Sequence, residues 1–111
     1  MKNLDNKILV LHIKEACESI LKFVEGKEYD DFSKDDMLLS AVIRKFEIIG
    51  EASSKTTDDF KKSNSDVPWG IMIGMRNWLI HGYFGVDSKT VWDTVQEDIP
   101  ILYEKIINLV K

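Results

Sequence analysis

The chain has 111 residues, of which 44% are hydrophobic and 31% are charged. This length and balance indicate one globular domain, residues 1–111, and exclude a disordered or fibrous chain. Fifteen Lys and Arg residues against nineteen Asp and Glu give a formal net charge of -4, which disfavours a nucleic-acid binder with a broad basic face. If the protein handles RNA, the positive potential must be concentrated in a cleft or supplied by a partner.

Cysteine content and hydropathy exclude further classes of protein. The one cysteine, Cys17, excludes an intramolecular disulfide and a cysteine-based zinc site, and its place on an apolar helical face predicts a small core residue. No stretch approaches the ~18 apolar residues of a membrane span, and no secretory signal is evident. We therefore expect a cytoplasmic protein without a membrane partner.

The first predicted helix runs from Asn3 to about Val24. Its apolar residues recur at helical spacing, and Gly26 is a suitable stop. These residues are Leu9, Ile13, Ala16, Cys17, Ile20 and Val24. His12 has no second His, Asp or Glu at an obvious ligand spacing, so we interpret it as a partly exposed helix residue.

The second predicted helix runs from Lys34 to roughly Lys62, after an acidic connector. Ser33 and Asp36 resemble a capping box that opens it. Its apolar stripe is wide enough to be covered on two sides, by the core and by a second subunit. The stripe consists of Leu38, Leu39, Val42, Ile43, Phe46, Ile49 and Ala52. Gly50 lies within it at a cost of about 0.5–1 kcal/mol relative to alanine, so we expect another backbone to approach there.

The third predicted helix runs from about Pro68 to His81, with Asp66 as a candidate N-cap. Gly70 and Gly74 lie one turn apart and form a flat ridge that another helix can approach closely. The remaining residues are apolar on nearly all sides, which predicts the central helix of the fold.

The last predicted helix is capped by Asp87 or Ser88, and Pro100 should kink or split it near Asp98. Its apolar residues form a regular stripe: Val91, Val95, Ile99, Leu102, Ile106 and Leu109. No strand-like alternation appears along the chain. The predicted fold is therefore all-α, an up-and-down bundle of four long helices with the last one kinked or split.

The third helix carries the most reactive set of side chains near its C-terminal end. Arg76, Asn77 and His81 interrupt an otherwise apolar segment, and a buried arginine needs a partner because an unpaired buried charge is costly. Glu51 is a candidate carboxylate to pair with and orient Arg76. Arg76 and His81 are five residues apart, about 140° around an ideal helix, so either the helix unwinds near Gly82 or a second chain completes the site.

These side chains suit metal-free cleavage of RNA. His81 can transfer protons to or from the attacking 2′-hydroxyl or the leaving oxygen, and Arg76 can hold a phosphate and stabilise charge in the transition state. Asn77 can orient the imidazole or donate to a phosphate oxygen. No cluster of carboxylates or histidines indicates a metal site, and no cofactor is expected. The structural alternative is that Arg76 is tied to Glu51 and His81 caps the helix C-terminus.

Arg76, four residues, His81, one residue and Tyr83 together resemble the Arg-x4-His-x-Tyr motif of HepT-like proteins, a branch of the HEPN superfamily. The resemblance extends through the chain in order, with 41–44, 48–52 and 67–69 upstream and Trp92 near the last helix. It implies a HEPN-like helical homodimer with a composite active site. It also implies metal-independent endoribonuclease activity assigned to Arg76 and His81.

The same resemblance implies a partner and a regulatory site. HepT-like toxins are neutralised by a MntA-type minimal nucleotidyltransferase, an antitoxin that adds AMP to the motif tyrosine. By resemblance, Tyr83 is that acceptor, and RNA is the substrate. The alternative is a non-catalytic helical binding or scaffold module that partners a nucleotidyltransferase, which the acidic composition favours.

Overall fold

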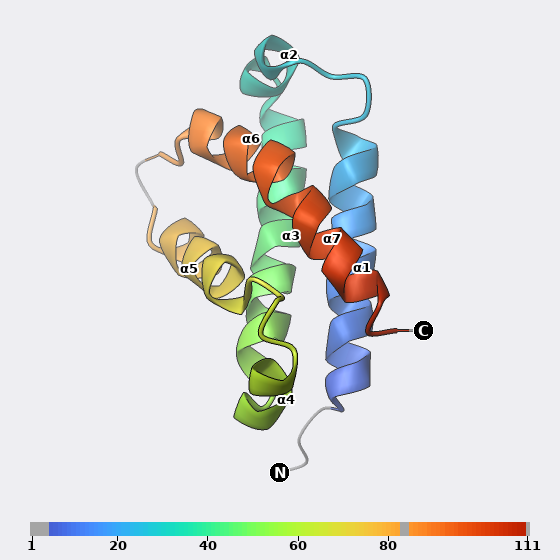
Figure 1. Ribbon diagram of the computed structural model, residues 1–111. Helices are drawn as coiled ribbons and strands as arrows, with labels where there is room; N and C mark the ends of the chain where they lie inside the picture. The colour runs from blue at the N-terminus through green and yellow to red at the C-terminus, as the bar shows by residue number, and fades with distance from the viewer. Residues whose placement is uncertain (1–4, 83–84, 111) are drawn as a thin grey trace.

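The computed structural model describes residues 5–82 and 85–110, which form seven helices and no strand (Figure 1). The helices are α1 (Asn6–Phe23), α2 (Tyr29–Lys34), α3 (Asp36–Lys55), α4 (Asp58–Ser63), α5 (Trp69–Ile80), α6 (Ser88–Glu97) and α7 (Ile99–Ile107).

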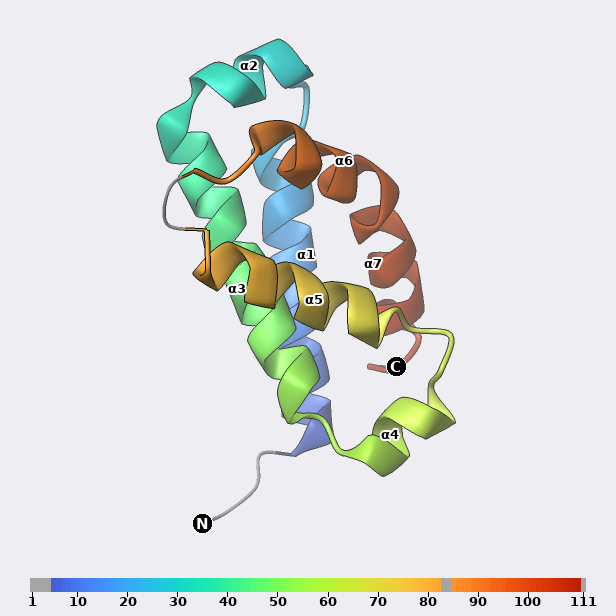
Figure 2. The same cartoon turned by 90° about the vertical axis from the view of Figure 1, so that its left-hand side faces the viewer.

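The two longest helices, α1 and α3, lie side by side, and α6 and α7 run diagonally across one face of this pair (Figures 1 and 2). α5 packs on α3. Buried apolar side chains from all of these helices meet in one core, which includes Ile13, Phe46, Met72 and Leu102. The predicted all-α bundle is thereby confirmed, including the division of the last helix beside Pro100 at Asp98.

Several helix ends differ from the sequence-based prediction. The predicted connector contains α2, which Glu28 and Asp31 open with a capping box. Asp35, rather than Ser33, caps α3, where its side chain accepts from the Leu38 N–H at 3.0 Å. The Ser33 hydroxyl instead donates to the Asp30 carbonyl inside α2. Asp35, the residue directly before the first turn of α3, therefore takes the capping position.

The predicted second helix is interrupted before α4. The Thr56 N–H and hydroxyl both bond to the Ser53 carbonyl, and Thr57 is extended and caps α4 through Phe60 N–H. Asn6 bonds to Thr57 through both its amide oxygen and its amide nitrogen, which fixes this corner against the start of α1. Two adjacent threonines can satisfy backbone groups with their hydroxyls, and this competes with helix continuation.

α5 is not the central helix, contrary to the prediction from its composition. It starts at Trp69 behind Pro68, and Asp66 does not cap it. Ile71 and Trp78 are 51% and 39% exposed on one edge of the helix, and Ile80 is 45% exposed on the edge that carries Arg76. α3 occupies the central position instead, since it packs against α1, α2 and α5. The apolar outer side of α5 is therefore uncovered by the described part of the chain.

Two further expectations concern burial and membranes. Cys17 is fully buried, as predicted, and burial raises the pKa of its thiol to about 12. Among the helices described, none is both long enough and apolar enough to cross a membrane.

Candidate functional site: an arginine groove and a helix-end histidine

Gly50 allows α5 to approach α3 closely at Arg76. A Cβ on Gly50 would lie 2.1 Å from Arg76 Cβ and 2.9 Å from the Met72 carbonyl oxygen. Such distances are impossible for real atoms, so no other residue fits without moving α5. The close approach expected at this glycine is confirmed, and it fixes where the Arg76 side chain begins.

Glu51 connects Arg76 to a second cation. The Arg76 Nη1 donates to Glu51 Oε1 at 2.5 Å, and Lys55 Nζ lies 3.4 Å from Glu51 Oε2. The Arg76 side chain is 21% exposed and that of Glu51 48%, so the pair contributes little to stability, roughly 0.2–1 kcal/mol. Its clearer effect is geometric, because it fixes the direction of the guanidinium group.

The opposite edge of the Arg76 guanidinium has no acceptor among the described residues. Its Nε is buried without a hydrogen-bond partner, and no hydrogen bond from Nη2 is found in 5–82 or 85–110. An unsatisfied buried donor costs about 1–3 kcal/mol. Nε and Nη2 form one of the two-pronged edges with which arginine binds phosphate and carboxylate groups.

Arg76 and Glu51 line a groove of about 530 Å³ formed by α1, α3 and α5. Its ionisable side chains are His12, Arg44, Glu47, Glu51, Lys55 and Arg76. Arg44 Nη1 lies 3.6 Å from Glu47 Oε1. The groove thus brings together three cations, two carboxylates and one histidine.

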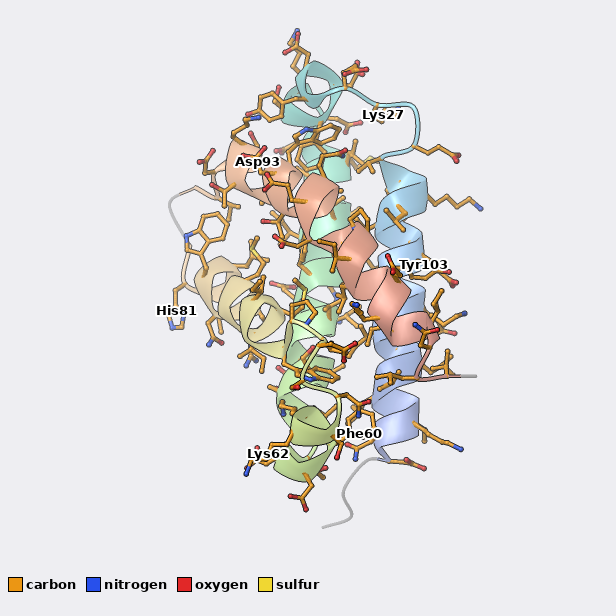
Figure 3. All side chains as sticks on the ribbon, in the orientation of Figure 1. Lys27, Phe60, Lys62, His81, Asp93 and Tyr103 are labelled. Atoms are coloured by element: carbon orange, nitrogen blue, oxygen red, sulfur yellow. The ribbon has the colours of Figure 1, made fainter. Side chains whose placement is uncertain are left out.

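His81 lies at the end of α5 and points away from the bundle (Figure 3). The helix ends at Ile80, and His81 Nδ1 lies 2.8 Å from the Asn77 carbonyl oxygen. Since a carbonyl only accepts, Nδ1 carries the proton, and Nε2 is the nitrogen left to accept or donate a proton. The backbone of Asn77 orients the ring, whereas no hydrogen bond is found for its exposed side-chain amide within the described chain.

Within one chain, the structure therefore brings Arg76 and Glu51 together but leaves Arg76 and His81 apart. Arg76 faces the groove with Ile80, whereas His81 is exposed at the helix end. The separation follows from their spacing on the helix. Tyr83, the predicted AMP acceptor, lies outside the described residues.

The sequence analysis did not assign four ionisable side chains of the groove to the site: His12, Arg44, Glu47 and Lys55. His12 was interpreted as a partly exposed helix residue, and it is exposed on α1. It follows the buried Leu9 by three residues and precedes the buried Ala16 by four, so it flanks the buried stripe of α1. That spacing places a residue at the edge of a helix contact, but the contact becomes a groove only once α3 is positioned.

No group of three or more His, Cys, Asp and Glu side chains within the described ranges could hold a metal ion. The fold and the site define a small all-helical protein with an incompletely paired arginine in a groove and a histidine at the C-terminal end of the same helix.

Comparison with known proteins identifies the family. Residues 13–109 match the family model Ribonuclease HepT-like. A protein of Thermococcus cleftensis named "Probable ribonuclease HepT" is 48% identical over 99 residues, or 89% of this chain and 90% of that protein. A Methanocaldococcus jannaschii protein provisionally named an RNase is 39% identical over 106 residues, or 96% and 97% of the two chains. No solved structure matches significantly. The chain belongs to the HepT-like ribonuclease family.

Proposed function

We propose that this protein is a metal-independent endoribonuclease whose active site combines residues from two copies of the chain. The observation that carries the proposal is the Arg76 guanidinium, which Glu51 holds by one nitrogen while its Nε–Nη2 edge has no acceptor in the described residues. A substrate phosphate supplies two acceptors to such an edge. Family membership favours RNA as the source of that phosphate.

The reaction needs one proton-transfer group and one anion-binding group. Nε2 of His81 accepts the proton of the attacking 2′-hydroxyl, or donates a proton to the leaving 5′-oxygen. The new bond joins the 2′-oxygen to phosphorus, and the bond to the 5′-oxygen breaks, which leaves a cyclic phosphate and a free hydroxyl. Arg76 stabilises the additional charge on the phosphorane. No step requires a metal ion.

The proposal requires a homodimer because one chain keeps the two groups apart. α5 also carries Ile71 and Trp78, which are large exposed apolar residues outside the groove. Two-fold pairing through surfaces near α5 would place Arg76 of one copy beside His81 of the other. The site therefore gives a physical reason for a dimer.

We further propose that the protein is the toxin of a toxin–antitoxin pair. In this proposal a MntA-type minimal nucleotidyltransferase adds AMP to Tyr83. Tyr83 is two residues from His81 in the sequence, and a bulky anion there would compete with an RNA phosphate. Tyr83→Phe should therefore cleave RNA yet escape the partner, and silencing of this variant by the partner would show that the acceptor is another residue.

The deciding experiment is RNA cleavage by the purified, unmodified protein in excess EDTA. A folded His81→Ala variant should be inactive, and Lys89→Gln, purified in parallel, should retain the parent rate. Equal residual cleavage by the parent and His81→Ala would indicate a contaminating nuclease. If the parent does not cleave several RNAs and its intact mass shows no added AMP, the nuclease proposal fails in favour of a non-catalytic scaffold for a nucleotidyltransferase.

A further inference from the structure

The arginine groove continues beyond Arg76 along the surface between α1 and α3. A second hollow of about 260 Å³ adjoins it and shares His12 and Ile48 with it. Lys45 and Ser19 line the far part of this second hollow. A continuous path therefore runs from Arg76, past His12, to Lys45.

The charge along this path differs from that of the whole chain. Four cations line the two hollows against three carboxylates, whereas the whole chain has fifteen cations against nineteen carboxylates. The charged residues are Glu15, Arg44, Lys45, Glu47, Glu51, Lys55 and Arg76. A local cationic excess on an acidic protein favours a polyanion at this place.

The apolar lining limits which part of a nucleotide can bind. Leu9, Ile48, Ala52 and Ile80 are aliphatic, and no Phe, Tyr or Trp side chain lines either hollow in the part of the chain that the structure describes. Base recognition on single strands generally uses aromatic stacking. The path is therefore suited to ribose and phosphate groups rather than to reading base identity.

His12 lies where the two hollows meet. It is exposed, and its ring makes no hydrogen bond or ion pair with the residues in 5–82 and 85–110. A histidine ring can donate to a phosphate oxygen or to a ribose hydroxyl. Within one chain, His12 rather than His81 shares the groove with Arg76.

We propose that the groove lined by His12, Arg44, Lys55 and Arg76 binds the sugar–phosphate unit of single-stranded RNA next to the phosphate held by Arg76. His12 contacts the strand at the junction, and the strand continues toward Lys45. The groove volume of about 530 Å³ is in the range of small-molecule sites, roughly 300–1,000 Å³, and suits one such unit. This inference rests on the proposed function in that Arg76 holds the reacting phosphate.

The test uses a 2′-O-methyl RNA trinucleotide, which has no free 2′-hydroxyl and so binds without being cut. The chain has two histidines, and a His12→Gln variant assigns their ring signals in an NMR spectrum. The His12 signal should shift and saturate as the trinucleotide is added. Calorimetry should show binding about tenfold weaker for Lys55→Gln, an effect of the size expected for one charged contact.

Lys89→Gln is a matched control for Lys55→Gln. Both lysines pair with an acidic residue four positions away in the sequence, at 3.4 Å for Lys55 and 3.1 Å for Lys89, and their side chains are 54% and 57% exposed. Lys89 lies outside both hollows. An unmoved His12 signal at saturating trinucleotide, or equal weakening by the two lysine variants, would overturn the proposal.

The same measurements separate this inference from the proposed function. If the parent cleaves RNA in EDTA while the His12 signal stays fixed, the nuclease stands and the groove proposal fails. If the His12 signal shifts and Lys55→Gln binds more weakly while no RNA is cut, the groove binds the nucleotide chain and the nuclease proposal fails.

Discussion

Replacing Gly50 with alanine should separate α5 from α3 and move Arg76 out of position. The new Cβ would lie 2.1 Å from Arg76 Cβ, 2.8 Å from Arg76 Cγ and 2.9 Å from the Met72 carbonyl oxygen. Arg76 Cβ and the Met72 carbonyl are fixed to the backbone of α5, so a side-chain rotation cannot relieve the overlap. At a normal carbon–carbon separation of roughly 3.5–4.0 Å, α5 must retreat by about 1.5 Å.

Two opposing terms set the size of the stability change. Overpacking of this kind costs typically about 1–3 kcal/mol, and alanine recovers about 0.5–1 kcal/mol of helix propensity. The free energy of unfolding should therefore fall, by up to about 2.5 kcal/mol. For a chain of this size each kcal/mol lowers the melting temperature by roughly 4–8 °C.

The assay combines urea unfolding, thermal melting and RNA cleavage. Gly50→Ala should be less stable and should lose most of its cleavage at temperatures where it remains folded, because a displacement near 1 Å at a catalytic group costs about 10²-fold. Gly70→Ala is the control, since a Cβ at Gly70 meets nothing within 4 Å and lies at the other end of α5 from His81. A Gly50→Ala protein as stable and as active as the parent would refute the close-packing argument.

Two further predictions concern pH. Burial raises the pKa of the Cys17 thiol to about 12, whereas an unfolded thiol has a pKa of about 8.5. Above about pH 9 only the unfolded chain then loses this proton. Relative to Cys17→Ala, the free energy of unfolding should therefore fall by up to about 1.4 kcal/mol per pH unit. Urea titrations that give the two proteins the same dependence of unfolding free energy on pH would contradict this. The Tyr103 hydroxyl, 2.7 Å from Glu18 Oε2, and then Lys14 lower the pKa of Glu18. The stabilisation of the folded state by ionised Glu18 is present above the ordinary carboxyl pKa and is lost as the pH falls through the lowered pKa of Glu18. Tyr103→Phe should raise the Glu18 pKa in an NMR titration. An unchanged pKa would show that the hydroxyl has no effect.

Helix periodicity predicted the bundle better than the helix ends. The apolar stripes of α1 and of α6 with α7 are buried as predicted except for Leu109, which is partly buried, and Asp87 caps α6. The sequence-based prediction misplaced both ends of α3. Several polar residues near each end can act as helix caps, and the sequence alone does not show that Asp35 caps α3 and that Thr57 caps α4. The apolar composition of α5 reflected an uncovered surface, which periodicity cannot distinguish from a buried one.

The features of the candidate site that depend on residues close together in the sequence could be predicted. Gly50 within a helical stripe indicated the close approach, and the five-residue spacing of Arg76 and His81 indicated that they diverge. His12 was not predictable, because its significance depends on α3 lying beside α1 and exposing a groove between them. The role of such a residue depends on contacts between segments that are far apart in the sequence, so the spacing of nearby residues does not indicate it.

The divergence of Arg76 and His81 leads to a test of the composite site that needs no structure of the dimer. If one site takes Arg76 from one copy and His81 from the other, Arg76→Ala and His81→Ala homodimers are both inactive. A heterodimer of the two variants contains one complete site and one site that lacks both groups. Random pairing makes half of the dimers heterodimers, so an equal mixture allowed to exchange should recover about one quarter of the parent rate.

Exchange must be shown independently, by pulling down an untagged variant with a tagged one after mixing. Recovery of activity in exchanged mixtures then supports a site shared between copies. If the variants exchange and the mixture stays inactive, Arg76 and His81 act within one chain. In that case α5 would have to unwind before His81 to bring Nε2 toward the groove, since the helix ending at Ile80 holds the two side chains apart.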